Sequence, residues 1–472
     1  MSQLSFYKSF DVLVLRSENE DDLLLIQRGT KNAIHLDQRA SSFWRDWKGG
    51  PVRNETELAI AASLSDAGMV FEDESPSPLP AMTFDNEVPQ PAGPHIKSYQ
   101  ETPGLTVVFN TRKPQIFTLA EAASLCWQLI LKRQTVGQIG SEILRTFRRD
   151  VGPELVSIFA EYELIDPIDG LAPSERADLR HQFFIPAIEY WLPHAKVPWT
   201  CDWELNTVCN LRCKHCYLPH HKAHGTSAGS ALDTCQQLID LGTPIVELLG
   251  GEVLLRTDLE QIVTKLSAAN VYVSAISNGT LMTAERARGL AAAGLSRIMF
   301  SLDGLDQQTH DACRGEGTFV KTLEAIKVAQ AAGIGRVQII WTTHGENFAD
   351  LPRLPDFLDS IGVTGCCIDL FKKTGILGGK SGFTPLTREQ IVAAKATIAG
   401  WQSSHRHIWA GFEPECTCGR TRLTIGADRS VRTCTFDSKA NGNLDETTLT
   451  EIWAANRDGY STAGPIGYCK AG

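Results

Sequence analysis

The hydrophobic pattern of the first 75 residues predicts a small module in which strands are followed by helices. Three short apolar runs are separated by polar turns, and they predict strands over 12–15, 23–27 and 32–36. From Asp37 the apolar residues recur at helical spacing, and a second helical pattern covers 58–70. We therefore expect a first module over residues 1–75.

A similar order of elements recurs after a proline-rich stretch, which predicts a linker over 76–103. Apolar runs predict two strands at 106–110 and 115–119, and helical patterns follow over 119–130, 135–147 and 153–166. Aligning 119–130 with 36–47 matches Leu119, Ala123, Ser124 and Trp127 to Leu36, Ala40, Ser41 and Trp44. We interpret this as a divergent internal repeat, although any strand followed by an amphipathic helix gives some chance matches. A second module is thus expected over 104–170, with a linker over 171–198.

From about Trp199 strand-like runs alternate with helical ones, which is typical of a parallel sheet with crossover helices. The strand-like runs are 203–208, 244–251, 271–279, 297–304, 337–343 and 365–371. About six βα units fit before residue 400, fewer than the eight of a complete barrel. The expected fold class is α/β, with a partial (β/α)6 TIM-like barrel over 199–400 and a small irregular domain over 401–472.

Composition and charge narrow the function classes. The chain has 472 residues with 45 basic and 55 acidic side chains, and a net charge of −10 disfavours a nucleic-acid binder with a broad basic face. No apolar run is long enough to span a bilayer, and the N-terminal residues lack the features of a signal peptide. We expect a cytoplasmic protein with reduced thiols and with neither a nucleic acid nor a membrane as partner.

Thirteen cysteines in such a compartment need an explanation, and seven of them form two groups. The groups are Cys209, Cys213 and Cys216, then Cys416, Cys418, Cys434 and Cys469. Clustered thiols in a reducing compartment indicate metal sites rather than disulfides.

The first group lies in the segment CNLRCKHCY, residues 209–217, with the spacing C-x3-C-x2-C. Zinc is one interpretation, because four histidines lie nearby: His215, His220, His221 and His224. However, the segment follows the first predicted barrel strand, at the end where barrel enzymes place their chemistry. Three thiolates on one loop can also hold three irons of a [4Fe–4S] cluster and leave the fourth iron open for a small ligand.

The segment resembles the signature of radical S-adenosylmethionine (SAM) enzymes, and Tyr217 fits the aromatic position of that signature. Three later segments, each after a predicted barrel strand, strengthen the resemblance: GGE, SNGT, and SLDG with a following RG. The resemblance implies that SAM is bound by Gly250, Gly251, Glu252, Ser277, Asn278, Ser301, Asp303 and Arg314. It also implies that one electron from the cluster cleaves SAM to a 5′-deoxyadenosyl radical, which abstracts a hydrogen atom from the substrate.

The C-terminal cysteines resemble those of the auxiliary-cluster domains, named SPASM or twitch, that follow many radical SAM barrels. In such domains one cysteine leads into a small hairpin and another ends it, as in CGRTRLTIGADRSVRTC, residues 418–434. The resemblance implies at least one auxiliary [4Fe–4S] cluster held by Cys416, Cys418, Cys434 and Cys469. Structural zinc is the alternative.

The two N-terminal modules resemble winged-helix-like peptide-recognition domains, such as the peptide chaperone of pyrroloquinoline quinone synthesis. Those domains bind a leader peptide by adding it as a strand to a sheet edge. The resemblance implies a ribosomally made peptide or small protein subunit as substrate. The alternative is that both modules serve only for packing.

Together these resemblances imply a peptide maturase that forms a cross-link, most readily a thioether from a substrate cysteine to an Asp or Glu carbon. A flavodoxin or ferredoxin type of reducing partner is implied as well. Alternatives are carbon–carbon cyclisation, oxidation of a Ser or Cys side chain, action on a small metabolite, or a zinc-stabilised adaptor without catalysis. Asp303, His344 and Asp369 lie near strand ends and are the candidates for a general base, although structural roles suit each of them better.

Overall fold

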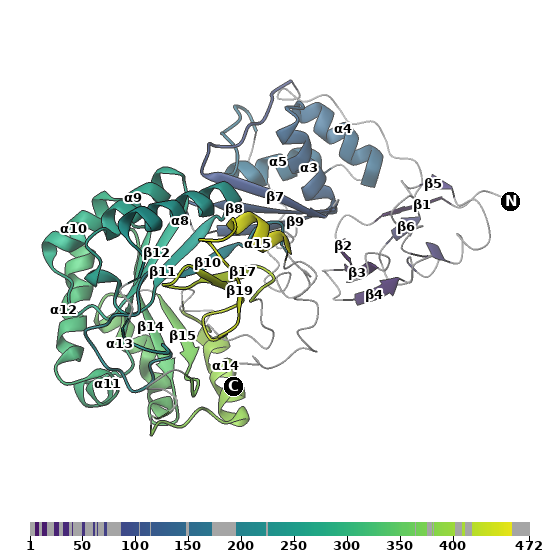
Figure 1. Ribbon diagram of the computed structural model, residues 1–472. Coiled ribbons are helices and arrows are strands. Elements are labelled where there is room, and N and C mark those ends of the chain that lie inside the picture. Colours follow the sequence, from purple (N-terminus) through teal and green to yellow (C-terminus); the bar gives the residue numbers. More distant parts are fainter. Residues whose placement is uncertain are drawn as a thin grey trace. The chain divides into compact units, whose positions relative to one another are not determined.

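In a computed structural model, the chain separates into two compact units, residues 1–196 and 197–472 (Figure 1). From residue 86 onwards the structure describes 86–102, 104–113, 115–147, 151–171, 195–222, 225–363, 365–374, 380, 382–401, 408–410 and 418–455. Before residue 86 it describes the strands given below together with Ala40, Ile60, Ala61 and Leu64. No helix in these parts of the chain is both long and apolar enough to cross a membrane.

The first unit begins with two small antiparallel sheets. The three predicted strands are confirmed, and they form one sheet in the order β2 (Val12–Arg16), β3 (Leu23–Gln27) and β4 (Asn32–Leu36). The second sheet has the order β5 (Gly50–Pro51), β1 (Ser5–Lys8) and β6 (Val70–Glu72). Ala40, Ile60, Ala61 and Leu64 are helical, and the rest of the two predicted helices lies outside the described residues.

A third antiparallel sheet is followed directly by three helices. The strands are β7 (Ile96–Thr102), β8 (Leu105–Asn110) and β9 (Gln115–Ala120), and the helices are α3 (Glu121–Leu131), α4 (Val136–Phe147) and α5 (Gly152–Glu161). The expected linker 76–103 is wrong at its end, because β7 pairs with β8 over most of its length. This strand was missed because its residues, IKSYQET, are mostly polar, as suits a strand at the edge of a sheet.

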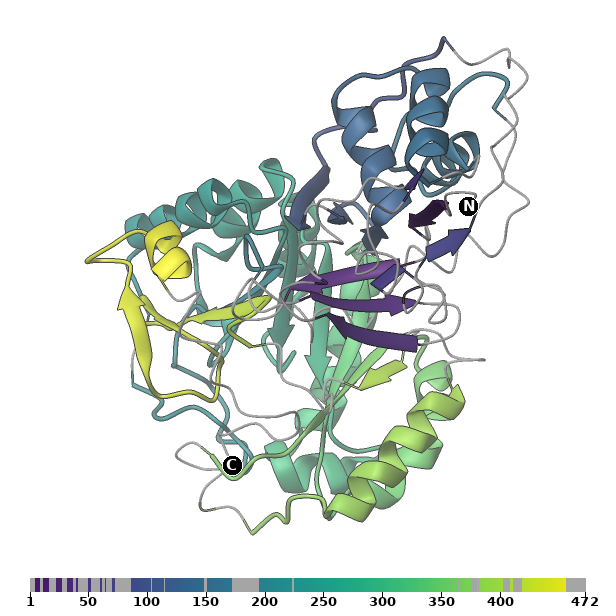
Figure 2. The same cartoon turned by 90° about the vertical axis from the view of Figure 1, so that its right-hand side faces the viewer.

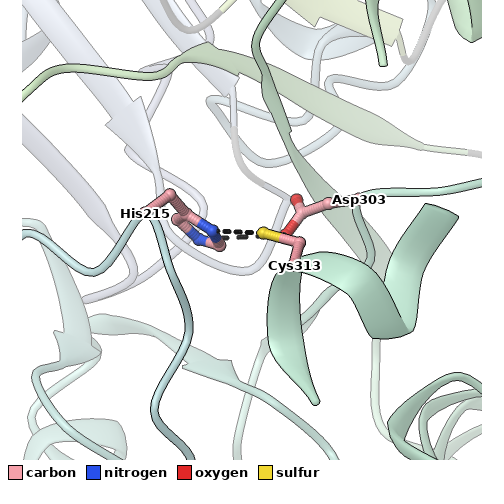
Figure 3. A group of neighbouring side chains, drawn as sticks. All are labelled: His215, Asp303 and Cys313. Carbon is pink, nitrogen blue, oxygen red and sulfur yellow. Dashed lines mark hydrogen bonds and ion pairs between the residues drawn. The ribbon is translucent and has the colours of Figure 1, made fainter. Parts of the chain in front are cut away.

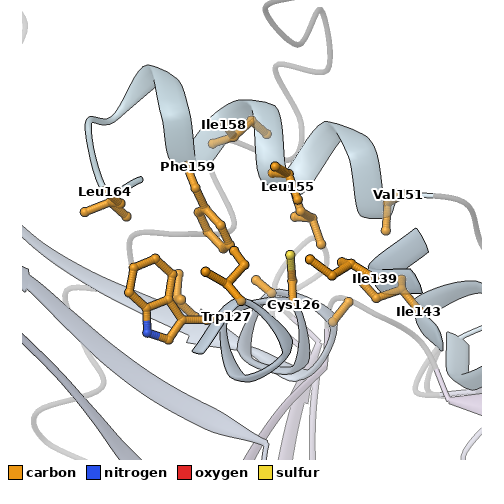
Figure 4. Close-up of a cluster of buried hydrophobic side chains, with 14 of the residues drawn as sticks. Cys126, Trp127, Ile139, Ile143, Val151, Leu155, Ile158, Phe159 and Leu164 are labelled. Atoms are coloured by element: carbon orange, nitrogen blue, oxygen red, sulfur yellow. The ribbon is translucent and has the colours of Figure 1, made fainter. Parts of the chain in front are cut away.

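These helices enclose an apolar core with the sheet (Figure 4). Cys126, Trp127 and Ile130 recur on one face of α3 and are buried, as the sequence periodicity predicts. The Trp127 ring meets Phe159 of α5 edge to face, with ring centroids 5.5 Å apart. Each fully buried large side chain contributes about 1.5–3 kcal/mol, so this core favours the packing of the three helices against the sheet.

The second unit is built on one ten-stranded sheet, in the order β16-β15-β14-β13-β12-β11-β10-β17-β18-β19. The first eight strands in this order are parallel to their neighbours. Six of them correspond to the predicted barrel strands: β10 (Thr200–Glu204), β11 (Ile245–Leu249), β12 (Tyr272–Ser277), β13 (Arg297–Ser301), β14 (Val337–Thr343) and β15 (Cys366–Leu370). Five of these lie within the predicted runs, whereas β10 overlaps its predicted run, 203–208, only at its last two residues. The expected partial TIM-like barrel is therefore confirmed, with β16 (Ile408–Ala410) added after its sixth strand.

Helices run along the outer face of this sheet (Figures 1 and 2). They are α8 (Ala228–Leu241), α9 (Leu259–Ala268), α10 (Ala284–Ala292), α11 (Gln307–Arg314), α12 (Thr318–Ala331), α13 (Leu354–Ser360) and α14 (Arg388–Trp401), with short 3-10 turns at Val253–Leu255 and Phe348–Arg353. Each crossover helix between parallel strands follows from the alternation of apolar patterns in the sequence.

The C-terminal hairpin extends the barrel sheet. Its strands are β17 (Arg422–Ile425), β18 (Ser430–Arg432) and β19 (Ala440–Asn443), followed by α15 (Leu449–Ala455). β17 lies parallel to β10, whereas β18 and β19 are antiparallel, and the yellow strands in Figure 2 continue the edge of the sheet. The hairpin expected within the separate domain 401–472 thus shares a sheet with the barrel.

Register divides the barrel residues between two faces. Cys201, Val246 and Val273 are partners in register and fully buried, so they form the face that packs under the helices. Asp202 and Glu247 are also partners in register, and successive residues of a strand point to opposite faces. The inner face is therefore polar, and its carboxylates pair with arginines, as between Asp202 and Arg422 at 3.0 Å. The carboxyl ends of these parallel strands meet at one edge, where the candidate site lies.

Candidate active site

The cysteine loop begins at Cys209, five residues after the end of β10. Cys213 is buried, whereas Cys209 and Cys216 are partly exposed. The backbone of the loop is tied to helix α11, because the amide of Lys214 donates to the carbonyl of Cys313 at 2.9 Å. All three predicted cysteines of the first group therefore lie together at the carboxyl edge of the sheet.

Each thiol has a polar neighbour. The amide of Leu211 lies 3.4 Å from Cys209 Sγ, Arg314 Nη1 lies 3.8 Å from Cys213 Sγ, and His221 Nε2 lies 3.3 Å from Cys216 Sγ. Burial raises the pKa of Cys209 and of Cys216 to about 11. These thiols are thus protonated at neutral pH unless a bound cation deprotonates them, and a metal-coordinated thiol is deprotonated outright.

The spacing of these sulfurs disfavours a single zinc ion. Ligands of one tetrahedral zinc at about 2.3 Å from the metal lie about 3.8 Å from one another. Among the described residues, only His215, Asp303 and Cys313 bring three such donor atoms within 4.8 Å of one another. The sulfurs of the three loop cysteines do not all lie within 4.8 Å of one another. This donor set suits a cluster with several metal ions, in which each cysteine binds a different iron.

The GGE segment needs its two glycines because the backbone of residues 206–208 lies very close to them. Gly250 has φ +127°, and a Cβ there would lie 2.3 Å from the carbonyl oxygen of Asn206. A Cβ on Gly251 would lie 2.0 Å from the carbonyl oxygen of Val208. Because 206–208 leads into the cysteine loop, these two glycines fix the loop against the end of β11.

Glu252 is completely buried, and its carboxylate is held by three groups of the chain. Oε1 accepts hydrogen bonds from the amide of Leu254 at 3.0 Å and from Ser277 Oγ at 2.7 Å. Oε2 accepts from the amide of Asn278 at 2.8 Å. Burial raises the pKa of Glu252. The carboxylate therefore joins the turn after β11 to the turn after β12.

Asn278 links the SNGT turn to the cysteine loop. Its Nδ2 donates to Asn210 Oδ1 at 3.0 Å and lies 3.8 Å from Cys209 Sγ. Its Oδ1 accepts from the hydroxyl of Thr280 at 2.7 Å, and Asn210 Nδ2 donates to that same hydroxyl oxygen at 2.8 Å. The predicted residues Ser277 and Asn278 thus lie beside the predicted cluster ligands.

The segment after β13 brings Asp303 and Arg314 together. Arg314 Nε donates to Asp303 Oδ2 at 2.5 Å, and the amide of Thr342 donates to Asp303 Oδ1 at 2.8 Å. Burial alone would raise the pKa of Asp303, but the guanidinium of Arg314 holds that pKa well below its ordinary value. Asp303 is therefore an ion-pair partner and a poor proton acceptor at neutral pH. Ser301, also predicted, is largely buried at the end of the same strand.

His215, Cys313 and Asp303 converge within the site (Figure 3). His215 Nδ1 lies 2.7 Å from Cys313 Sγ, and Cys313 Sγ lies 3.9 Å from Asp303 Oδ2. The guanidinium of Arg314 supplies a positive charge to this group, because it lies within hydrogen-bond distance of both Asp303 and His215. Burial and the adjacent Arg314 lower the pKa of His215 to about 3, so the imidazole is neutral.

The other two candidates for a general base lie on neighbouring strand ends. His344 Nδ1 lies 3.0 Å from Glu346 Oε2, and its ring stacks on Phe383 with centroids 4.2 Å apart. Its Nε2 is buried without a hydrogen-bond partner among the described residues, and burial lowers the pKa of His344. Asp369 lies at the inner face on β15, where burial raises the pKa of its carboxyl. The structure places both near the carboxyl edge but not in contact with the cysteine loop through any hydrogen bond of the described residues.

Tyr217 and the second cysteine group lie towards β17 and β18. The Tyr217 ring meets Phe436 edge to face, with centroids 5.7 Å apart, and burial raises the pKa of its hydroxyl. Cys418 precedes β17, and Cys434 follows β18 and accepts from the amide of Phe436 at 3.3 Å. Cys416 and Cys469 lie outside the described residues.

Several supporting residues were not predicted from the sequence. Asn206 donates from Nδ2 to the carbonyl of Glu252 at 3.1 Å, and His310 Nδ1 accepts from the amide of Asp303 at 3.2 Å. The sequence signals for His215 and Cys313 were present, because His215 lies inside the cysteine motif and Cys313 immediately precedes Arg314. Asn206 and His310 carry no comparable signal.

Comparison with known proteins agrees with this geometry. Residues 203–358 match the family described as the Radical SAM superfamily. An AdoMet-dependent heme synthase of Methanosarcina barkeri is 28% identical over 311 residues, which cover 57% of this chain and 87% of the relative. Mycofactocin maturase MftC of Mycobacterium tuberculosis is 32% identical over 173 residues, 35% of this chain and 43% of the relative. This chain thus spans less than half the length of that maturase.

A solved structure of similar fold is Streptococcus suis SuiB bound to precursor peptide SuiA. The similarity has a TM-score of 0.55 at 14% identity and covers 77% of this chain and 88% of SuiB. At this identity the similarity concerns the fold. Residues 203–358 match the radical SAM family, which implies a [4Fe–4S] cluster and SAM as the cofactors of this region.

Proposed function

We propose that the protein is a radical SAM peptide maturase that cross-links a ribosomally made peptide or a small protein subunit. The observation that carries the proposal is the cysteine loop at the carboxyl edge of the partial barrel, bordered by the turns after β11, β12 and β13. When bound, the cluster and SAM supply a 5′-deoxyadenosyl radical for hydrogen abstraction.

In this proposal Cys209, Cys213 and Cys216 hold the cluster. The backbone of Gly250 and Gly251, with the buried carboxylate of Glu252, receives the SAM amino group. Ser277 and Asn278 border the ribose, as the hydrogen bonds from Asn278 to the cysteine loop support. Tyr217, Ser301, Asp303 and Arg314 complete the wall of the site. These residues bind and orient, and they keep water away from the reacting carbon.

The N-terminal modules, predicted over 1–75 and 104–170, are proposed to recognise the peptide. β7 adds 96–102 to the second module, and 76–95 and 171–198 are the proposed connections. The sheet order β7-β8-β9 supports this, because β9 has no strand beyond it among the described residues and leaves an edge for an added strand. A hollow of about 660 Å³ lies beside this sheet's helices, lined by Leu129, Thr135, Gln138 and Arg145 among others. The similarity to a mycofactocin maturase, and to the fold of an enzyme solved with its precursor peptide, supports a peptide substrate.

The region 401–472 is proposed to hold an auxiliary [4Fe–4S] cluster through Cys416, Cys418, Cys434 and Cys469. Support comes from the β17–β18 hairpin, which has Cys418 before its first strand and Cys434 after its second. Such a cluster, next to the radical SAM domain, suits the binding of a substrate thiolate and the acceptance of the electron left after bond formation.

A thioether from a substrate cysteine is the reaction we propose within this class. In size and in its two-part N-terminus the chain resembles the maturation protein of quinohemoprotein amine dehydrogenase, which links cysteines to Asp or Glu carbons. Reduction of the cluster requires a partner of the flavodoxin or ferredoxin type. Carbon–carbon cyclisation and oxidation of Ser or Cys are the alternatives within the same chemistry.

The test is anaerobic co-expression with the small open reading frames beside the gene, followed by intact and tandem mass spectrometry of each peptide. Loss of two hydrogens per event, with fragmentation blocked between a cysteine and its acceptor, is the expected result. The same loss with every cysteine still alkylatable indicates carbon–carbon or oxidative chemistry. Zinc in place of iron, with no SAM cleavage, would establish the non-catalytic adaptor instead.

A second candidate function is modification of a tetrapyrrole. The alignment with a heme synthase, which extends over 87% of that relative, favours it. It leaves the N-terminal modules without a role in catalysis. Incubation of the full chain with SAM, a reductant and iron coproporphyrin, followed by chromatography of the porphyrins, separates the two candidates.

A further inference from the structure

Four side chains, of which Asp303 is one, form a closed ring of hydrogen bonds. Arg314 Nε donates to Asp303 Oδ2 at 2.5 Å, and Arg314 Nη2 lies 3.3 Å from His215 Nε2. His215 Nδ1 lies 2.7 Å from Cys313 Sγ, which lies 3.9 Å from Asp303 Oδ2 (Figure 3). All four side chains are buried or nearly so: His215, the least buried, exposes 12% of its side chain.

The direction of each hydrogen bond follows from the chemistry of the donors. A guanidinium can only donate, so His215 Nε2 must accept from Arg314. A neutral imidazole carries its proton on the other nitrogen, and His215 Nδ1 therefore donates to Cys313 Sγ. The thiol proton of Cys313 then points to the Asp303 carboxylate. Each hydrogen bond of the ring therefore has one donor and one acceptor, and no two protons point at each other.

The third guanidinium nitrogen leaves the ring and reaches a predicted cluster ligand. Arg314 Nη1 lies 3.8 Å from Cys213 Sγ. Each of the three nitrogens of Arg314 therefore has a partner within the protein, and the side chain is 8% exposed. This arrangement differs from the role implied by the family resemblance, in which Arg314 contacts SAM.

We propose that Arg314 is a positioning residue, which His215, Cys313 and Asp303 hold in place so that it donates a charged hydrogen bond to the Cys213 thiolate. A donor to a ligating sulfur stabilises the more negative, reduced form of a cluster, so Arg314 raises the reduction potential of the cluster in the radical SAM domain. The ring also joins the cysteine loop to the loop after β13, which keeps Cys213 at a fixed position. The inference rests on the proposed assignment of Cys213 as a cluster ligand.

The experiment is an EPR-monitored redox titration of the reconstituted full chain without SAM, for the wild type and Arg314→Gln. The signal that changes when SAM is added afterwards identifies the cluster with the open iron. Arg314→Gln is expected to lower the equilibrium constant for reduction at least tenfold, which corresponds to a midpoint about 59 mV more negative. Because the midpoint is measured without SAM, it reports on the cluster independently of any effect of the substitution on SAM binding.

Arg297→Gln is the matched control, because Arg297 is also a largely buried arginine paired with a carboxylate, Glu247 at 2.8 Å. Its removal should leave the midpoint potential unchanged. His215→Ala keeps the charge of Arg314 but opens the ring, so a smaller shift of the same sign is expected. That variant also provides a measurement should Arg314→Gln fail to hold a cluster.

An unchanged midpoint in Arg314→Gln and in His215→Ala, together with a large loss of SAM affinity in Arg314→Gln, would overturn the proposal and make Arg314 a SAM ligand. Absence of any cluster in the wild type would instead contradict the assignment of the cysteine loop. The two failures are therefore distinguishable.

Discussion

Ser277 donates a hydrogen bond from Oγ to Oε1 of Glu252 at 2.7 Å, and both side chains are buried at the carboxyl edge of the sheet. The contact joins the turns after β11 and β12, which come from separate βα units. A buried carboxylate is stable only when its oxygens are satisfied, and here they accept from Ser277 and from the amides of Leu254 and Asn278. Glu252 is thus a structural tie as well as a candidate ligand.

Ser277→Ala should lower the free energy of unfolding by about 1–3 kcal/mol, because the buried Glu252 Oε1 loses a hydrogen-bond donor. The measurement is anaerobic urea unfolding followed by circular dichroism. Ser360→Ala is the control, since its exposed hydroxyl donates to the carbonyl of Phe357 in the same helix, and a change within about 0.5 kcal/mol is expected. Equal losses for the two variants would contradict the structural role of the Ser277–Glu252 contact.

Gly251→Ala should prevent assembly of the cluster. The new Cβ would lie 2.0 Å from the carbonyl oxygen of Val208, so the backbone leading to Cys209 would have to move. We expect iron content and the absorbance near 400 nm to fall to a small fraction of the wild type after anaerobic reconstitution.

Gly400→Ala is the matched control for that substitution. Gly400 lies in α14 with nothing within 4 Å of the added Cβ, so Ala should be neutral or stabilise the helix by up to about 1 kcal/mol. Normal iron content in Gly251→Ala would show that the loop can reach its ligand geometry without the close approach to Val208.

The sequence predicted the frame of the site well, because its signals are local. Strand-like runs and the turns GGE, SNGT and SLDG mark positions along the chain, and parallel strands bring their carboxyl ends to one edge. The placement of Cys209, Glu252 and Asn278 side by side follows from that rule alone. The strands β12 and β14 lie within the predicted runs for the same reason.

Contacts between distant segments could not be predicted in this way. The pairing of β17 with β10 joins residues more than 200 positions apart, and no local pattern indicates which edge a hairpin will extend. The strand β7 was missed because one face of an edge strand needs no apolar residues. The partner of Arg314 was likewise hidden, since a charged residue in a sequence does not reveal which carboxylate or thiol it will meet.

The proposed auxiliary cluster predicts a defined loss of iron. If Cys418 and Cys434 are ligands, Cys434→Ala should reduce the iron content from about eight to about four atoms per chain, while the cluster that responds to SAM remains. Iron analysis and EPR with and without SAM make the measurement. Cys235→Ala removes a buried thiol of α8 and should leave the iron content unchanged. Full iron content in Cys434→Ala would remove the support for an auxiliary cluster at this hairpin.

His310 predicts a pH dependence of stability whose sign is fixed by its surroundings. Its Nδ1 accepts from the amide of Asp303 at 3.2 Å, so protonation would replace an acceptor by a donor. Burial, together with the nearby Arg314, lowers the pKa of His310 to about 4, compared with 6.5 for an unperturbed imidazole.

Between pH 4 and 6.5 the unfolded chain binds a proton at His310 that the folded protein does not bind, so stability rises with pH in this window. The contribution of His310 is complete above pH 6.5 and is lost as pH falls towards 4. It should amount to about 2 kcal/mol between pH 7.5 and pH 5. His310→Gln keeps an acceptor for the Asp303 amide but cannot titrate, so its free energy of unfolding should fall by about 2 kcal/mol less than that of the wild type over the same interval. Parallel pH profiles for the two proteins, measured by urea unfolding, would mean that His310 is accessible to protons in the folded state and that the hydrogen bond from Asp303 does not control its charge.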